Sequence, residues 1–357
     1  MPDSALTTET SPVRAAHAFD EKSLERYLQA NVPGFSGKLE VRQFKGGQSN
    51  PTFFLTAGGV SYVMRKKPPG KLLPGAHAVE REYQVIKALQ GTGVPVPKVY
   101  CLCTDESVIG TPFFVMEHVQ GRIFRNSLMP EARDTAERAA VYDSMNDTLA
   151  RLHKVDWAAV GLTGYGKPGN YMARQIATWT KQYLASKTQD VPTMDKLLDW
   201  LPKNIPAADE TTIAHGDFRL ENMIVHPTEP RVVAVLDWEL STLGHPLADL
   251  GYNCIGYHLP PSKEGGASSG FVGVDIQGLG IPSEKDYVAA YCRRTGRKEI
   301  GDLDFYVAFS LFRLAAIVQG VYKRGLDGNA SSETALQYGP LVGFLSKHAV
   351  DLVGKRM

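Results

Sequence analysis

The chain reads HGDFRLEN at residues 215–222 and DWE at residues 237–239, and these two stretches decide the fold. Between them, apolar runs at 223–226 and 232–236 flank a turn that contains two prolines. Short apolar runs separated by a proline-containing turn are typical of a β-hairpin. We therefore expect the end of the first stretch and the start of the second to meet at one end of a hairpin.

The side chains of these stretches suit phosphoryl transfer. One carboxylate must face the attacking hydroxyl, while an amide and a second carboxylate hold magnesium on the nucleotide phosphates. We interpret Asp217 as the catalytic base, with a turn-capping role as its alternative, and Asn222 and Asp237 as magnesium ligands. Glu239 is a further candidate ligand, although a structural carboxylate fits it equally well. Arg219 could neutralise phosphate charge or only pair with a nearby acid.

This pattern resembles the aminoglycoside phosphotransferase-like kinases, which are small-molecule relatives of the protein kinases. The run VLDWELSTLGHPLAD at 235–249 is most similar to one branch, the kinase-like region fused to some acyl-CoA dehydrogenases. The resemblance extends over roughly residues 35 to 325. It implies ATP and Mg²⁺ as cofactors and a structural role for His215. It also implies that residues 215–222 form the catalytic loop, whose backbone Asp249 ties to its own helix.

Hydrophobic patterns on either side of the motif indicate two lobes. The N-terminal part predicts a helix at 21–30, another at 76–89, and strands at 39–44, 52–57, 60–64, 99–103 and 113–116. The C-terminal part is mainly helical, with helices expected at 132–155, 171–187, 193–201, 247–258, 284–295, 302–323 and 332–353. The expected fold class is α+β, a two-lobed protein-kinase-like fold. Its N-lobe, at 19–117, is an antiparallel sheet plus helix, and its C-lobe, at 118–357, is mainly helical with a catalytic-loop hairpin.

The N-terminal residues 1–18 are rich in Ser, Thr, Ala and Pro and have no apolar core. This composition predicts a disordered tail. We therefore expect that deletion of this segment changes neither the melting temperature nor the activity.

Two segments of the N-lobe are candidates for nucleotide binding through the backbone. The segment after the last strand, with Glu117 and Val119, is the expected adenine-binding hinge, and a plain connection between lobes fits its side chains equally well. The loop after the first strand has small residues whose N–H groups could approach phosphates, with a plain hairpin loop as the alternative. This candidate phosphate loop consists of Gly46, Gly47, Gln48, Ser49 and Asn50.

Arg65 is the expected phosphate-binding cation, because the resemblance places it where many kinases keep a lysine. Glu82, on the following helix, is its expected partner, with Glu80 as the rival and an ordinary solvated helix face as the alternative. Lys66 alternates to the other face of the strand, where we expect it to be solvated.

Composition gives no support for several classes of protein. The net charge of +1 does not favour a nucleic-acid or membrane-surface partner. No apolar run approaches the ~20 residues that a membrane span needs. The 4 cysteines have no spacing typical of a disulfide framework, which fits structural thiols in a reducing cytoplasm. We expect a cytoplasmic monomer or homodimer that binds neither nucleic acid nor membrane.

The acceptor is expected to be a small molecule. Asp249 follows Asp237 by only 12 positions, which leaves no room for the long activation segment of a protein kinase. Residues 284–357 hold 11 basic and 8 acidic groups, which disfavours a polycationic aminoglycoside and suits an anionic acceptor. The resemblance suggests a hydroxyacyl-CoA, bound by the C-terminal helices and the glycine-rich segment 260–282.

Two other classes of function remain open. One is a catalytically inactive pseudokinase that only binds nucleotide. The other is a metal-dependent hydrolase built on His215, Asp217 and Asp237 with His226 or His245.

Overall fold

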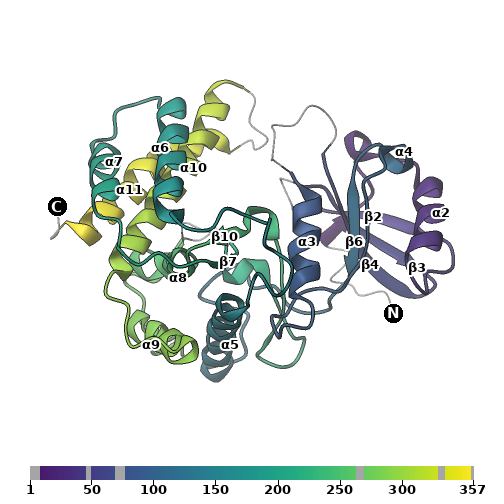
Figure 1. Cartoon of the computed structure of the whole chain (residues 1–357), viewed down its shortest axis with the longest axis horizontal. Coiled ribbons are helices and arrows are strands. Elements are labelled where there is room, and N and C mark those ends of the chain that lie inside the picture. Colours follow the sequence, from purple (N-terminus) through teal and green to yellow (C-terminus); the bar gives the residue numbers. More distant parts are fainter. Residues whose placement is uncertain (1–8, 46–49, 69–76, 263–268, 329–333, 355–357) are drawn as a thin grey trace. The chain divides into compact units, whose positions relative to one another are not determined.

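The computed structural model describes residues 9–45, 50–68, 77–262, 269–328 and 334–354, which form two compact units (Figure 1). Unit 1 contains residues 1–121 and 233–239, and unit 2 contains residues 122–232 and 240–357. The expected α+β, two-lobed organisation is confirmed. The boundary between the units lies at Gly121, and the segment with Asp237 belongs to unit 1.

Unit 1 is built on a six-stranded antiparallel sheet with the strand order β1-β2-β3-β4-β6-β5. All the expected strands are present, and β1 is an additional strand at the edge. The strands are β1 (Thr10–Ser11), β2 (Glu40–Phe44), β3 (Thr52–Ala57), β4 (Val60–Lys66), β5 (Val99–Cys103) and β6 (Phe113–Glu117). The helices are η1 (Ala15–His17), α2 (Glu21–Asn31), α3 (Val79–Leu89) and α4 (Glu106–Ile109).

Helices α2 and α3 cover opposite faces of this sheet (Figure 1). Leu24 and Leu28 form the apolar side of α2 and share one buried core with Phe53 of β3. Because side chains alternate along a strand, β4 directs Arg65 to the other face, where α3 supplies Glu82. The period-2 pattern of the strands thus directs Arg65 away from the core that α2 covers and towards α3.

The N-terminal residues differ from the expected disordered tail, because residues 9–18 are ordered, while residues 1–8 lie outside the described part. Thr10 pairs with Phe44, and its Oγ1 accepts a 2.7 Å hydrogen bond from Arg42 Nε. The buried side chain of Gln43 accepts a 3.0 Å bond from the Arg14 N–H and contacts His17 Nδ1 at 2.7 Å. The sequence gives no local sign of this strand, because its partner lies some thirty residues further along the chain.

Deletion of residues 1–18 is therefore expected to destabilise unit 1. The deletion leaves the buried Gln43 without these partners, and an unpaired buried polar group costs about 1–3 kcal/mol. A loss of this size lowers the melting temperature by roughly 2–8 °C. Thermal unfolding of the truncated and full-length proteins measures it, and deletion of residues 1–8 alone is the control. Equal melting temperatures for all three proteins would contradict the role of β1.

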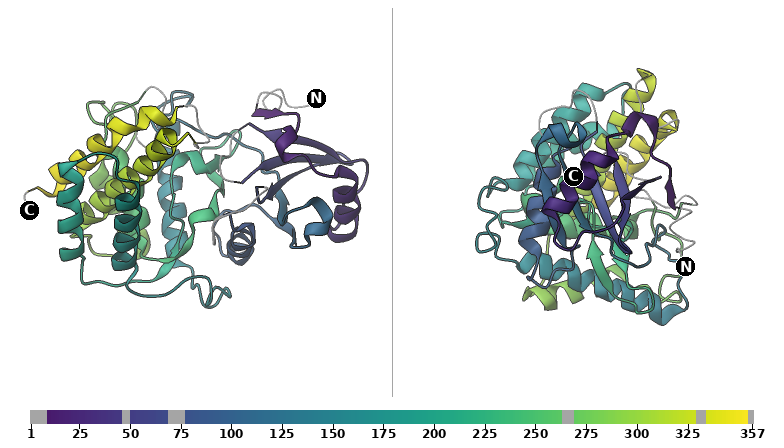
Figure 2. Two further views of the ribbon diagram at one scale, coloured as in Figure 1. Left: turned by 90° about the horizontal axis from the view of Figure 1, so that it is seen from above. Right: turned by 90° about the vertical axis from the view of Figure 1, so that its right-hand side faces the viewer.

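Unit 2 is mainly helical, as expected. Its helices are α5 (Thr135–Lys154), α6 (Tyr171–Ser186), α7 (Pro192–Lys203), α8 (Pro246–Cys254), α9 (Glu284–Thr295), α10 (Leu303–Leu326) and α11 (Gly339–Val353). Shorter 3₁₀ helices are η2 (Leu220–Asn222), η4 (Ile255–His258) and η5 (Ala335–Tyr338), and η3 (Trp238–Leu240) crosses the unit boundary. Helix α10 packs against α11, α8 and α6, and Figure 2 shows α10 beside α11 from two further directions.

Helix α10 is also long and apolar enough to cross a membrane by length and composition, which the sequence analysis did not anticipate. In this structure 78% of its apolar window is buried inside unit 2. A central helix of a folded unit has the same composition, because it is covered by neighbours on all sides.

Two short sheets frame the catalytic loop. Strand β7 (Thr212–Ala214) leads into the loop and pairs antiparallel with β10 (Thr242–Gly244). Strand β8 (Met223–Val225) leaves the loop and forms a two-stranded sheet with β9 (Val232–Val235). The hairpin expected between the two motif stretches is therefore present. The meeting of Asn222 with Asp237 at its end stays a prediction.

The 4 cysteines of the sequence all lie in the described part of the chain, and each is free and buried. Burial raises the pKa of the Cys101 thiol to about 12, so little reactive thiolate forms at neutral pH. These properties fit structural thiols.

Glu137, in the first turn of α5, gives the stability of unit 2 an acid dependence. Its side chain accepts hydrogen bonds from Arg122 Nη2 at 2.8 Å and from the Arg133 N–H at 2.6 Å. Burial alone would raise the pKa of Glu137, but these partners outweigh burial and lower it from 4.5 to about 2. A depressed pKa means stabilisation that is present above pH 4.5 and lost as the pH falls towards 2.

We therefore expect Glu137→Gln to flatten the acid limb of the stability curve. The wild type should lose on the order of 3 kcal/mol between pH 5 and pH 2 from this group alone. Urea unfolding at several pH values in this range measures the difference. Parallel curves for the two proteins would show that Glu137 does not carry the effect.

Candidate active site

A buried carboxylate, Asp249, holds the backbone of the catalytic loop. Asp249 lies in the first turn of α8, and its Oδ2 accepts from the His215 N–H at 2.6 Å. Its Oδ1 accepts from the Gly216 N–H at 2.8 Å, and His153 Nε2 lies 3.4 Å from Oδ2. Burial alone would raise the pKa of Asp249, but these partners lower it. The expected tie between Asp249 and the catalytic loop is therefore present.

The first two loop residues have scaffold properties. His215 is fully buried, its Nδ1 accepts a 3.2 Å bond from the Asp217 N–H, and its ring packs edge-on against Phe218. Gly216 has a φ of +84°, and a Cβ at this position would lie 2.8 Å from the Leu240 carbonyl oxygen. A glycine is thus required where the chain turns to present Asp217.

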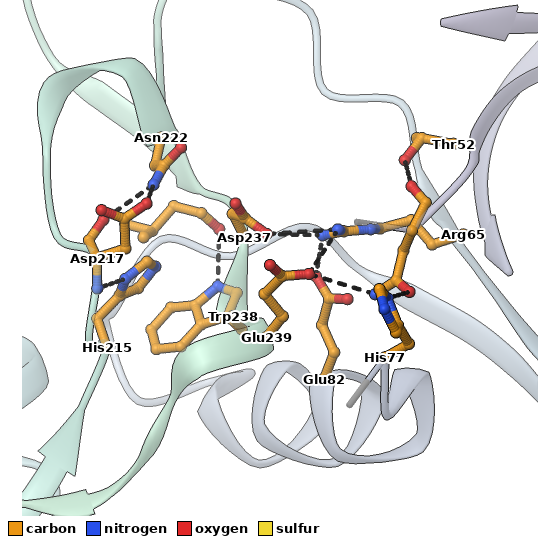
Figure 3. A network of polar contacts seen from close by, with 12 residues as sticks. Thr52, Arg65, His77, Glu82, His215, Asp217, Asn222, Asp237, Trp238 and Glu239 are labelled. Atoms are coloured by element: carbon orange, nitrogen blue, oxygen red, sulfur yellow. Dashed lines mark hydrogen bonds and ion pairs between the residues drawn. The ribbon is translucent and has the colours of Figure 1, made fainter. Parts of the chain in front are cut away.

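The Asp217 carboxylate is held by Asn222 and Arg219, and Figure 3 shows its contact with Asn222. Asn222 Nδ2 donates to Oδ2 at 2.8 Å, and Arg219 Nε lies 3.2 Å from Oδ1. The Tyr252 hydroxyl, from α8, is also near this carboxylate, and burial together with the negative charge of Asp217 raises the pKa of Tyr252. Since Arg219 Nη1 lies 3.0 Å from Glu221 as well, Arg219 has two acidic partners.

Asn222 has a geometry that suits a metal ligand. Its Nδ2 group donates to the Asp217 backbone carbonyl at 2.9 Å as well as to the Asp217 carboxylate. Both N–H bonds of the amide are thereby used, which fixes its orientation (Figure 3). Its Oδ1 has no hydrogen-bond partner within the described residues, so a neutral oxygen remains for a hard cation.

Unit 2 contains a cavity of about 50 Å³ whose wall includes neighbours of this carboxylate. Arg219 and Tyr252, which both contact Asp217, belong to its wall. Most of the remaining wall is aromatic or apolar, and its described residues include no Asp or Glu. Prominent members are Tyr142, Met145, Ile255, Tyr257, Phe271 and Tyr287. Phe271 comes from the glycine-rich segment that was expected to contribute to the acceptor pocket.

Unit 1 contains a second charged cluster, centred on Arg65 (Figure 3). Arg65 Nη1 forms a short ion pair with the buried carboxylate of Glu82, and it lies 3.3 Å from Asp237 Oδ1. Arg65 Nη2 lies 3.7 Å from Glu239 Oε2. Glu80 instead pairs with Lys67 at 2.6 Å, so the expected partner Glu82, and not its rival, meets Arg65.

Burial and charge oppose each other in this cluster. The pKa of Glu82 is raised overall, to about 7, because burial raises it by more than the Arg65 guanidinium and the Trp238 backbone lower it. The three carboxylates together raise the pKa of Arg65 against the effect of burial. Arg65 is thus a fixed cation whose neighbours include both candidate metal ligands of unit 1.

An unusual backbone conformation sets the direction of the Asp237 side chain. Asp237 has a φ of +65°, a left-handed conformation that Asp tolerates better than most residues. The next residue, Trp238, is fully buried and donates from Nε1 to the Val235 carbonyl at 2.9 Å. The buried indole therefore anchors the turn, and the Asp237 side chain stays 36% exposed.

Lys66 corrects one expectation. It does lie on the face of the sheet opposite to Arg65, but it is only 2% exposed rather than solvated. Its Nζ lies 5.2 Å from the Phe19 ring centroid and 5.9 Å from that of Phe53, and burial lowers its pKa. Phe19 comes from the segment before α2, which strand alternation alone cannot place.

The expected nucleotide-binding segments are described only in part. Gly46, Gly47, Gln48 and Ser49 lie outside the described residues. Asn50 is buried, and its Nδ2 donates to Glu239 Oε2 at 3.4 Å. In the hinge, the Glu117 N–H donates to the Lys98 carbonyl at 2.7 Å. The Val119 N–H has no acceptor within the described residues, as an adenine-binding group requires.

Two residues of α8 support the catalytic loop, and neither was predicted to do so from the sequence. Tyr252 contacts Asp217, and Asn253 Nδ2 donates to the Phe218 carbonyl at 3.1 Å. These residues follow Asp249 at the i+3 and i+4 positions, which share a helix face with it. That spacing was the available signal, because the face that carries Asp249 must point towards the loop.

Comparison with known proteins agrees with this geometry. A model of the phosphotransferase enzyme family matches residues 40–267, a range that includes Arg65 and the whole catalytic loop. The chain belongs to the phosphotransferase enzyme family.

Relatives of this phosphotransferase-family chain confirm the resemblance to the kinase-like region of acyl-CoA dehydrogenases. Acyl-CoA dehydrogenase family member 10 of Mus musculus is 48% identical over 347 residues, 97% of this chain and 32% of that protein. The chain thus spans about a third of the length of this relative.

Solved structures extend the comparison. A Ralstonia eutropha JMP134 protein that was assigned as an aminoglycoside phosphotransferase is 51% identical, with a TM-score of 0.86 over 95% of this chain and 99% of that chain. A thermostable mutant of the aminoglycoside phosphotransferase APH(4)-Ia, in ternary complex with ADP and hygromycin B, is 14% identical. Its TM-score is 0.60 over 93% of this chain and 98% of that chain, which is a likeness of fold alone.

The donor set of this phosphotransferase-family chain fits the Mg²⁺ that the family implies. Magnesium prefers carboxylate and amide oxygens and keeps several waters, so few protein ligands are needed. Taken unit by unit, unit 1 offers the carboxylates of Asp237 and Glu239, and unit 2 separately offers the amide oxygen of Asn222. The described residues contain no group of three or more His, Cys, Asp or Glu side chains of the kind that a hydrolytic metal centre uses.

Proposed function

We propose that the chain transfers the γ-phosphoryl group of ATP to a hydroxyl of a small molecule. The observation that carries this proposal is the Asp217 carboxylate, which Asn222 and Arg219 hold, while Arg219 also lines an aromatic cavity. A base for phosphoryl transfer needs this combination of a fixed carboxylate and adjacent space for an acceptor. Membership of the phosphotransferase family supports the same chemistry.

In the proposed reaction Asp217 orients the acceptor hydroxyl and accepts its proton late. The hydroxyl oxygen forms a bond to the γ-phosphorus, the bond from that phosphorus to the β,γ-bridging oxygen breaks, and ADP leaves. Arg219 neutralises charge on the transferred group, and Arg65 contacts the nucleotide phosphates. Mg²⁺, when bound, supplies further charge neutralisation, and Asn222, Asp237 and Glu239 are the residues that would hold it.

The acceptor we favour is a hydroxyacyl-CoA or another metabolite rather than an aminoglycoside. The described wall of the cavity has several aromatic side chains, one guanidinium and no carboxylate, which suits an apolar or anionic acceptor. A polycationic sugar would need acidic partners there. The similarity to an acyl-CoA dehydrogenase family member supports an acyl-type acceptor.

Two measurements test the proposal in sequence. A thermal-shift titration with Mg-ATP and Mg-GTP, repeated without magnesium, should give a magnesium-dependent rise in melting temperature, since a ligand of the folded state stabilises it. A coupled ADP-release assay then compares hydroxyacyl-CoA thioesters, hydroxy acids and aminoglycosides. Nucleotide binding without turnover of any acceptor would favour a pseudokinase. No shift at millimolar nucleotide would contradict the ATP site.

Asp237→Asn is expected to remove most of the magnesium dependence of nucleotide binding. Asn keeps the shape and tolerates the left-handed backbone at this position, but it lacks the charge. The loss of affinity should be at least the roughly 100-fold that disturbing the surroundings of a metal ligand can cost. Calorimetry with Mg-ATP measures it, and the exposed Glu106→Gln in unit 1 is the control. Unchanged Mg-ATP affinity would refute the ligand assignment.

A further inference from the structure

Arg313 is a buried cation without a partner of opposite charge in the described part of the chain. It lies on α10 and is only 9% exposed. Its guanidinium carbon lies 5.4 Å from the ring centroid of Trp179 and 5.6 Å from that of Tyr252. Its Nε is buried and has no hydrogen-bond partner among the described residues, and no Asp or Glu described there reaches ion-pair distance.

Two other arginines of limited exposure do have acidic partners. Arg65 pairs with Glu82, and Arg297 forms two hydrogen bonds to Glu210, at 2.7 Å and 2.5 Å. A buried charge without a counter-ion is costly, and aromatic faces compensate only about 0.5–2 kcal/mol of that cost. A cation that is kept in such a place is therefore expected to have a ligand that supplies the missing negative charge.

Arg313 lies one aromatic ring away from the catalytic carboxylate. The ring of Tyr252 faces the Arg313 guanidinium, and its hydroxyl is near the Asp217 carboxylate, whose charge it feels. Tyr252 also belongs to the wall of the aromatic cavity. A negative charge bound at Arg313 would thus belong to a molecule that is held close to Asp217.

We propose that Arg313 binds an oxyanion of the acceptor and thereby selects anionic acceptors. This assignment rests on the proposed phosphotransferase function. A guanidinium that lies against ring faces keeps its edge for two parallel hydrogen bonds, the geometry that carboxylates and phosphates accept. The oxyanion has two possible sources, the carboxylate of a free hydroxy acid or a phosphate of a hydroxyacyl-CoA thioester.

Binding measurements without nucleotide test this assignment directly. The probes are 4-hydroxybutanoate, its neutral amide, and 4-hydroxybutanoyl-CoA, each titrated by thermal shift and calorimetry. We expect the wild type to bind at least one of the two anionic probes, and the amide about 10- to 100-fold more weakly than the carboxylate if the hydroxy acid is the source. Arg313→Gln should weaken binding of the anionic probe by a similar factor, and Arg313→Lys should weaken it less, because Lys keeps the charge but not the planar fork.

Two controls separate the loss of the Arg313 contact from a general loss of positive charge and from a loss of folding. Arg324→Gln removes the same charge from an exposed position on the same helix, so it should leave probe binding unchanged. The Mg-ATP thermal shift, measured on every variant, reports the folded state and the nucleotide site independently of Arg313. Equal probe binding by the wild type and both Arg313 variants, or no binding of either anionic probe to the wild type, would overturn the assignment. A wild type that binds the anion but not Mg-ATP would instead refute the proposed function.

Discussion

Asp217→Asn is expected to lower kcat by about 10²–10⁴-fold, the usual contribution of a positioned general base. The substitution preserves size and can still interact with Asn222 and Tyr252, which hold the native carboxylate. It removes the group that accepts the proton of the acceptor hydroxyl. Nucleotide affinity should change little, because in the proposed reaction Asp217 contacts the acceptor and not the phosphates.

The matched control for this variant is Asp199→Asn. Asp199 is an exposed carboxylate on α7 whose ion-pair partner is Lys203, one helical turn away, and exposed pairs of this kind contribute little to stability. Steady-state kinetics with the acceptor found in the screen, together with Mg-ATP calorimetry, separates chemistry from binding. Turnover within about tenfold of the wild type would remove Asp217 from the role of base.

The charge pairing of Arg65 in unit 1 has a consequence for nucleotide binding. Arg65 contacts Asp237 and Glu239, so its charge is neutralised by residues that are proposed to hold the metal. Phosphate and magnesium would arrive as a pair of opposite charges and could replace these ion pairs one for one. Such an exchange costs less than exposing a single new charge in a buried site.

The sequence predicted those parts of the structure that depend on local spacing. Strand alternation placed Arg65 and Lys66 on opposite faces, and the expected pairing of Arg65 with Glu82 of the following helix is confirmed. The catalytic-loop hairpin followed from two apolar runs and the turn between them. In each case a few neighbouring residues determine the result.

The wrong or missing predictions concern contacts between distant segments. Lys66 is buried because Phe19 covers it, and residues 9–18 are ordered because Gln43 offers them partners. The partners of Tyr252 come from the catalytic loop and from Arg313 on α10, more than thirty residues away in either direction. Hydrophobic period and residue type do not encode which remote side chain completes a hydrogen bond or covers a charge.

Asp249→Ala is expected to cause the largest loss of stability in unit 2, about 3–5 kcal/mol, the range found when one partner of a buried charge network is removed. The native carboxylate accepts from the backbone N–H groups of His215 and Gly216 and lies beside His153. Alanine removes the acceptor of both N–H groups in a buried site, and an unsatisfied buried donor costs about 1–3 kcal/mol. Urea unfolding of the variant and of Asp199→Ala, the exposed control, measures the difference.

Asp249→Asn separates the effect on stability from the effect on the position of Asp217. Its amide keeps one acceptor oxygen, so one of the two loop N–H groups stays paired while the other faces an NH₂ group. Stability should therefore lie between that of the wild type and the alanine variant. Activity should fall further than stability alone explains, because the loop that presents Asp217 is then held at one point rather than two. If Asp249→Asn keeps wild-type kcat at a temperature where it is fully folded, the carboxylate anchors the fold but does not set the position of Asp217.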